Sequence, residues 1–111
     1  MQIEVTHAVD ECTIRSQEDD TIYWHYKGTL LDGTEFHSGD FSATIGHGHV
    51  ITGVDKGMRD MCVGEKRKMT IHSDWAYGDA GRPGSIPPKA TLIFEVLLNK
   101  IERPDPTKAE L

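Results

Sequence analysis

Alternating apolar and polar side chains run through most of this chain, and the alternation predicts β-strands with one buried face. In residues 21–30, one face collects the side chains of Ile22, Trp24 and Tyr26. Residues 66–72 alternate in the same way. The longest and most apolar segment, residues 91–101, is expected in the centre of a sheet. Shorter strands are predicted at residues 3–8, 35–37 and 41–45.

One segment follows a helical period instead. Spacings of three, four and three residues separate four apolar side chains: Ile51, Val54, Met58 and Met61. This stripe predicts an amphipathic helix of about three turns. Because Gly53 and Gly57 each weaken a helix by ~1 kcal/mol, the helix should need packing against the sheet. The expected fold class is α+β, an antiparallel sheet of about five to six strands wrapped around one short amphipathic helix.

Length and charge exclude several classes of protein. With 111 residues, the chain is expected to form a single domain. Its 18 acidic and 12 basic residues give a formal charge of -6, which argues against a nucleic-acid or anionic-membrane partner. The basic run at residues 66–68 is interpreted as a solvated strand face. No apolar run approaches membrane-spanning length.

The segment from Tyr77 to Phe94 is the most informative for function. It is rich in glycine and proline, lies between two aromatic residues and runs into an apolar strand. A loop this long in a small domain is more often functional than filler. It contains no pattern for a nucleophile, a general acid or a phosphate-binding loop. Rings and prolines suit an apolar ligand of defined shape, so the segment predicts a binding pocket.

Landmark residues along nearly the whole chain resemble the FKBP-type peptidyl-prolyl isomerases, the macrolide-binding immunophilins. They occur in that family's order and spacing and are Tyr26, Asp32-Gly33, Phe36, Val50-Ile51, Gly64-Glu65, Ala76-Tyr77-Gly78, Ile86-Pro87-Pro88 and the run from Ala90 to Phe94. The resemblance implies a half-barrel antiparallel sheet wrapped on a short helix. It also implies one isomerase domain over residues 1–102, followed by a polar tail over 103–111.

The resemblance further implies a catalytic site. An X-Pro amide rotates over a barrier of ~18–20 kcal/mol because resonance stabilises its planar form. A catalyst therefore needs an apolar cage and suitable donors rather than a nucleophile, an acid or a base. The implied donors to a bound carbonyl are the Ile51 N–H and the Tyr77 hydroxyl. The implied residues are Tyr26, Phe36, His37, Ile51, Tyr77 and Phe94 for catalysis, and Phe41, Val50, Val54 and Ile86 for binding substrate or macrolide.

Three positions depart from the family pattern. His37 stands where many members carry an aspartate, Val54 where the pocket floor often carries a tryptophan, and Ala43 where an aromatic residue is common. Neither Trp24 nor Trp75 is expected on the floor. The partners implied are proline-containing polypeptides, with macrolides such as tacrolimus and rapamycin bound at reduced affinity by a monomer. A second function stays open, a weakly active chaperone or scaffold module.

Two cysteines and the end of the chain bear on its compartment. By themselves, Cys12 and Cys62 could form a disulfide, remain buried thiols or supply half of a metal site. The chain resembles the secretory-pathway branch of the family most, which implies a disulfide between them. Residues 108–111 match the Lys-Asp-Glu-Leu retrieval signal at three of four positions. The expected location is the lumen of the endoplasmic reticulum, with the cytoplasm as the alternative.

The histidines offer a rival chemistry. His47 and His49 form a His-x-His pair that could bind zinc together with His37 or His25. No third and fourth ligands are evident from the sequence, and the neighbouring glycines indicate a loop. We expect surface histidines, with no metal and no cofactor.

Overall fold

The alternating segments come together as one curved antiparallel sheet in the computed structural model, which describes residues 1–103. Within these residues the strands are β1 (Gln2–His7), β2 (Thr21–Leu30), β3 (Glu35–Thr44), β4 (Lys66–Ile71) and β5 (Leu92–Glu102). Their order is β1-β4-β5-β2-β3, so β5 lies in the centre, as its apolar sequence predicts. The helical elements are α1 (Thr52–Gly57) and a short 3-10 turn, η1 (Ser73–Trp75).

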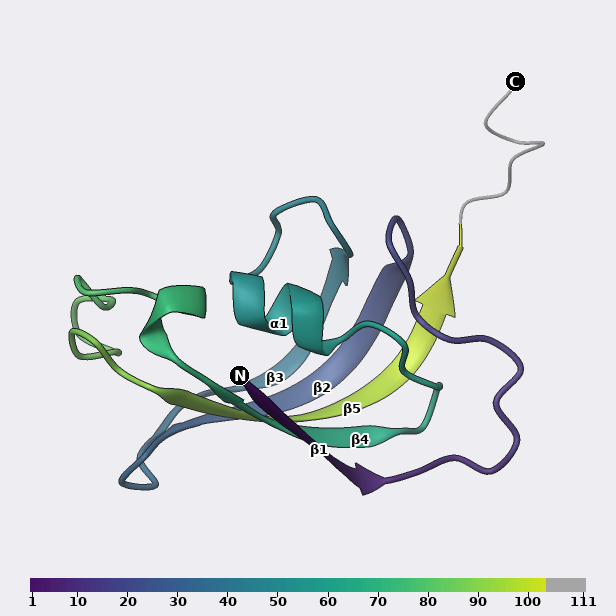
Figure 1. The fold of residues 1–111 in the computed structure, drawn as a ribbon, viewed down its shortest axis with the longest axis horizontal. Coiled ribbons are helices and arrows are strands. Elements are labelled where there is room, and N and C mark those ends of the chain that lie inside the picture. The colour runs from purple at the N-terminus through teal and green to yellow at the C-terminus, as the bar shows by residue number, and fades with distance from the viewer. Residues whose placement is uncertain (104–111) are drawn as a thin grey trace.

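The sheet curls around α1, which lies on its concave face (Figure 1). The core forms where the inward faces of β2, β4 and β5 meet the helix. It includes Ile22, Trp24, Met69, Ile71, Phe94, Val96, Leu98, Val54 and Met58. The alternation in β2 is confirmed, because His25 and Lys27 on its other face are exposed. The predicted α+β class is confirmed as well.

One strand is longer than the sequence predicts. The two short strands expected at residues 35–37 and 41–45 are a single strand, β3, paired with β2 from Thr44 to Glu35. The polar residues between them interrupt the apolar alternation, but they lie on an outer strand of the sheet, where side chains remain exposed. Backbone pairing with β2 keeps this stretch extended without apolar burial.

The helix is shorter than the predicted three turns. It ends at Gly57, and the Met58 N–H makes the last helical bond, to the Val54 carbonyl. Met58 and Met61 are buried as predicted, but they lie in the chain that leaves the helix. Asp60 adopts a left-handed φ of 61° and donates its N–H to the Ser16 carbonyl. The segment therefore turns toward residues 12–20 rather than continuing as a helix.

The helix glycines have a packing role that the sequence does not reveal. A Cβ atom at Gly53 would lie 2.4 Å from Cγ2 of Ile71, and one at Gly57 would lie 2.1 Å from Sδ of Met69. Both partner side chains come from β4. Glycine therefore lets α1 lie directly on the sheet, which offsets its low helix propensity.

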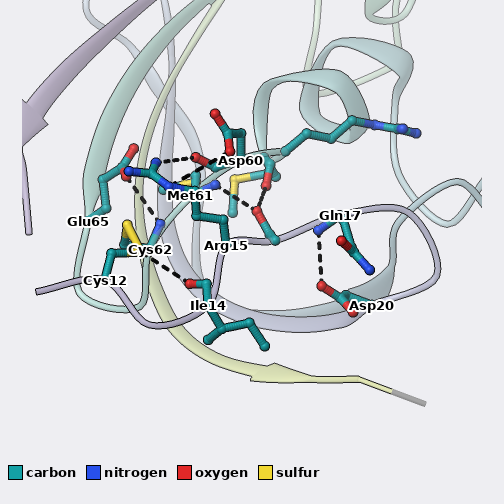
Figure 2. A network of polar contacts seen from close by, with 12 residues as sticks. Cys12, Ile14, Arg15, Gln17, Asp20, Asp60, Met61, Cys62 and Glu65 are labelled. Carbon is teal, nitrogen blue, oxygen red and sulfur yellow. Dashed lines mark hydrogen bonds and ion pairs between the residues drawn. A yellow bond between two sulfur atoms is a disulfide. The ribbon is translucent and has the colours of Figure 1, made fainter. Parts of the chain in front are cut away.

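The predicted disulfide is present. Cys12 and Cys62 are bonded at an S–S distance of 2.07 Å, next to backbone hydrogen bonds that tie residues 12–17 to the chain leaving α1 (Figure 2). The folded part also includes Arg103, the first residue of the predicted tail, which donates to both carboxylate oxygens of Asp20. The retrieval-like residues 108–111 lie outside the described residues. No helix within residues 1–103 has the length and hydrophobicity of a membrane span.

Candidate active site

A cavity of about 410 Å³ opens between the concave face of the sheet, the start of α1 and the loop that follows η1. Its walls come from three groups of residues. The sheet supplies Trp24, Tyr26, Phe36, His37, Phe41 and Phe94; the helix and the segment before it supply His49, Val50, Ile51 and Val54; the loop supplies Tyr77, Arg82 and Ser85. Every site residue expected from the sequence lines this cavity except Ile86.

Aromatic rings form the sheet side of the cavity. Phe36 meets Phe94 edge-on, with ring centroids 5.6 Å apart, and Tyr26 lies 6.1 Å from Phe94. A Cβ atom at residue 28 would come within 2.5 Å of Cζ of Phe36. Gly28 therefore allows the Phe36 ring to lie against the backbone of β2, and the three rings make an apolar cage.

Ile86 acts behind the cavity rather than in it. Its side chain is buried in the core with 5% exposure. Its backbone makes two hydrogen bonds of 2.8 Å with Arg82, one in each direction. These bonds close the loop between the two residues and hold Arg82 at the cavity wall. Residue spacing alone does not distinguish a side chain in the wall from one that anchors the wall.

The cavity floor differs from the expectation. Trp24 lines the cavity although neither tryptophan was expected there, and its side chain is only 3% exposed. It also lines a small void together with Ala43 and Val54, the two positions where the family often has larger side chains. The inward phase of Trp24 and the small size of its neighbours were visible in the sequence. Their proximity across the sheet and helix was not.

Two hydroxyl groups provide most of the polar chemistry. The Tyr26 hydroxyl shares a hydrogen bond with Nδ1 of His37. Burial raises the pKa of Tyr26, the Tyr77 phenol adds to this, and the Arg82 guanidinium opposes it. Tyr77 is half-buried and lines the cavity. Ile51 directly precedes α1 and lines the cavity as well. The predicted donors thus lie at the same cavity as the aromatic cage.

The histidines do not converge on one point. His47 pairs with Asp19, His25 pairs with Asp40, and Nδ1 of His49 accepts the Thr44 N–H. His37 contacts Tyr26 instead. In the part of the chain that the structure describes, no group of three or more His, Cys, Asp or Glu side chains is arranged to hold a metal ion.

The family comparison covers the entire cavity. The FKBP-type peptidyl-prolyl cis-trans isomerase family matches residues 12–99, a range that contains every cavity-lining residue. The chain belongs to this family. Its relatives agree with the match. The FKBP domain is 49% identical over 108 residues to peptidyl-prolyl cis-trans isomerase FKBP2 of Homo sapiens, covering 93% of this chain and 76% of the relative.

A fungal relative is similar to nearly the same extent. Over 106 residues the FKBP domain is 48% identical to FK506-binding protein 2 of Aspergillus fumigatus, covering 90% of this chain and 78% of the relative. The FKBP2 of Mus musculus is 49% identical over 108 residues, covering 93% of this chain and 77% of the relative. This protein is therefore a peptidyl-prolyl cis-trans isomerase, as its sequence predicts.

Proposed function

We propose that the FKBP domain isomerises X-Pro bonds in this cavity by caging the proline ring and donating hydrogen bonds, with no covalent or acid-base step. The observation that carries the proposal is the pairing of Tyr26, Phe36 and Phe94 with the donors of Ile51 and Tyr77 at one cavity. Planar amides are the better solvated and more strongly resonance-stabilised form. An apolar cage that removes water, with donors suited to the twisted amide, favours the transition state.

The same cavity is the proposed macrolide site. A volume of about 410 Å³ lies within the range of small-molecule sites, and the relative in Aspergillus fumigatus is named for binding FK506. We propose that tacrolimus and rapamycin bind here with reduced affinity. The reason is that His37 and Val54 replace a rim carboxylate and a floor tryptophan common in the family.

The compartment proposed is the lumen of the endoplasmic reticulum, with folding secretory chains as clients. The disulfide between Cys12 and Cys62 supports an oxidising compartment, since cytosolic thiols are kept reduced. We also propose that the domain acts as a monomer.

A direct assay separates catalysis from simple binding. NMR exchange spectroscopy on a short Leu-Pro peptide should show faster cis-trans exchange at catalytic concentrations of the domain. The rate should change little between about pH 6 and 8, because no proton is transferred. A bell-shaped profile would assign an acid or base role to His37. Peptide binding without faster exchange would support the alternative, a chaperone or scaffold module.

A further inference from the structure

The ionisable side chains at the cavity are unusually one-sided. Arg82, His37 and His49 line it, together with the two tyrosines, whereas none of the aspartates or glutamates within residues 1–103 does so. The chain as a whole carries a formal charge of -6. A ligand in this cavity therefore meets a local surface whose sign differs from that of the rest of the protein.

Arg82 stands apart from the other arginines of the chain. Arg15, Arg59, Arg67 and Arg103 each form an ion pair with an aspartate or glutamate. Among the described residues, Arg82 is the one arginine with no such pair. Its position is nonetheless defined, because its backbone is bonded in both directions to Ile86, and it lies near enough to Tyr26 to oppose the rise in that tyrosine's pKa.

An unpaired guanidinium beside an aromatic cage suits an anionic group on the ligand. Guanidinium groups bind carboxylates and phosphates through two parallel hydrogen bonds, and such charge-assisted bonds are stronger than neutral ones. Neighbouring apolar rings lower the local dielectric, which strengthens the attraction further. The two histidines leave the wall without a carboxylate that would repel an anion.

We propose that the FKBP domain prefers substrates in which an anionic side chain flanks the proline, and that Arg82 binds this side chain. The anion is the carboxylate of Asp or Glu or the phosphate of a phosphorylated Ser. This preference rests on the proposed function, because it concerns the peptide that occupies the same cavity. Arg82 acts as a specificity-determining residue rather than in the isomerisation step.

The test compares isosteric peptides that differ only in charge. Isomerisation of Glu-Pro and Gln-Pro peptides, of phosphoserine-Pro and Ser-Pro peptides, and of peptides with Glu or Gln after the proline is measured by NMR exchange. The anionic member of at least one pair should have a kcat/KM roughly 3- to 10-fold higher. The ratio should shrink at high salt. The carboxylate and phosphate arms show which anion the cavity accepts.

Charge reversal assigns the preference to its residue. Arg82→Glu should reverse the order, so that a Lys-Pro peptide becomes better than Glu-Pro. The matched control, Lys66→Glu, makes the same change in charge at an exposed position of β4 outside the cavity and should leave the wild-type ratio intact. Equal kcat/KM within every pair, or a ratio that Arg82→Glu leaves unchanged, would overturn the inference.

The two levels of proposal fail separately. If no peptide is turned over, the proposed isomerase mechanism is wrong, and calorimetric binding of the Glu-Pro and Gln-Pro pair still decides the charge preference. If all peptides are turned over at equal rates, the mechanism stands and the charge preference is wrong. A circular dichroism spectrum of Arg82→Glu that matches the wild type ensures that the comparison concerns folded protein.

Discussion

Trp24 of β2 and Val54 of α1 line the same cavity and the same small void beside it. The indole thus supplies apolar surface next to a helix position that carries only a valine. Trp24 also meets Phe41 edge-on at 5.4 Å, so it is held from the strand side. The floor of this FKBP domain is therefore built from the sheet.

The first prediction is that Trp24 contributes more to macrolide affinity than to turnover. Trp24→Leu removes apolar surface from the floor, and at ~25 cal/mol per Å² a loss of about 50 Å² weakens tacrolimus binding roughly tenfold. A prolyl ring is smaller and should lose less. Calorimetry with tacrolimus and exchange rates with a Leu-Pro peptide measure the two effects. An equal loss in both would place Trp24 in the proline cage itself.

Relocating the ring provides the matched variant. Val54→Trp alone should gain little, because Trp24 already occupies the adjacent space and overpacking costs about 1–3 kcal/mol. Val54→Trp combined with Trp24→Val should recover the tacrolimus affinity. Trp24 fluorescence should also respond to the ligand, and Trp75→Phe removes the signal of the exposed second tryptophan. Additive effects of the two substitutions would show that these side chains do not share one space.

The second prediction concerns the Tyr77 hydroxyl. Tyr77→Phe removes one neutral donor and should lower kcat/KM by about tenfold or less, since such a bond contributes ~0.5–1.5 kcal/mol. The unfolding midpoint should not change. Tyr23→Phe makes the same change outside the cavity and should leave kcat/KM unaltered. If the two variants behave alike, Tyr77 does not donate to the reacting amide.

Local patterns and non-local contacts differ in how far the sequence predicts them. The phase of β2 and the apolar length of β5 followed from local alternation, and the family landmarks implied the bond between Cys12 and Cys62. The contact of Trp24 with Val54 depends on the separation between sheet and helix. Arg82 depends on how its loop closes on Ile86. Periodicity carries no information about either, so both had to come from the structure.

The third prediction uses the helix glycines. Gly53→Ala should improve helix propensity by ~1 kcal/mol, but its Cβ would meet Cγ2 of the stiff, branched Ile71 at 2.4 Å, at a cost of about 1–3 kcal/mol. We expect a net loss of stability in urea unfolding. Gly57→Ala meets the flexible end of Met69 and should cost less. A stabilising Gly53→Ala would mean that α1 moves away from β4 freely.

The fourth prediction tests the disulfide. Cys12 and Cys62 are 50 residues apart, and closing a loop of this length should stabilise the fold by ~4 kcal/mol. Cys12→Ser combined with Cys62→Ser should lower the unfolding free energy by about this amount, as should reduction of the wild type. The double variant should not respond to reductant. Alkylation of both thiols in unreduced, folded protein would contradict the bond.

The last prediction follows from a buried charge pair. The Asp20 carboxylate has no exposed side-chain surface, and the Arg103 guanidinium bonds both of its oxygens at 2.9 Å. The hydrogen bond from Arg103 lowers the pKa of Asp20; burial opposes this, and the Gln17 N–H assists it. Since the folded pKa lies below the unfolded value of about 3.9, the stabilisation is present above that pH. It is lost as the pH falls through the folded pKa.

Arg103→Gln should therefore lower the unfolding free energy near pH 7 by about 1.5–3 kcal/mol, the range for hydrogen bonds to charged groups. The gap between variant and wild type should narrow below about pH 4, where Asp20 becomes protonated in both. Arg15→Gln is the matched control: its pair with Asp60 spans 4.0 Å between largely exposed side chains and should contribute ~1 kcal/mol or less. Urea unfolding from pH 2 to 7 measures all three proteins. A gap that stays constant with pH would show that Arg103 stabilises the fold by packing rather than through the charge of Asp20.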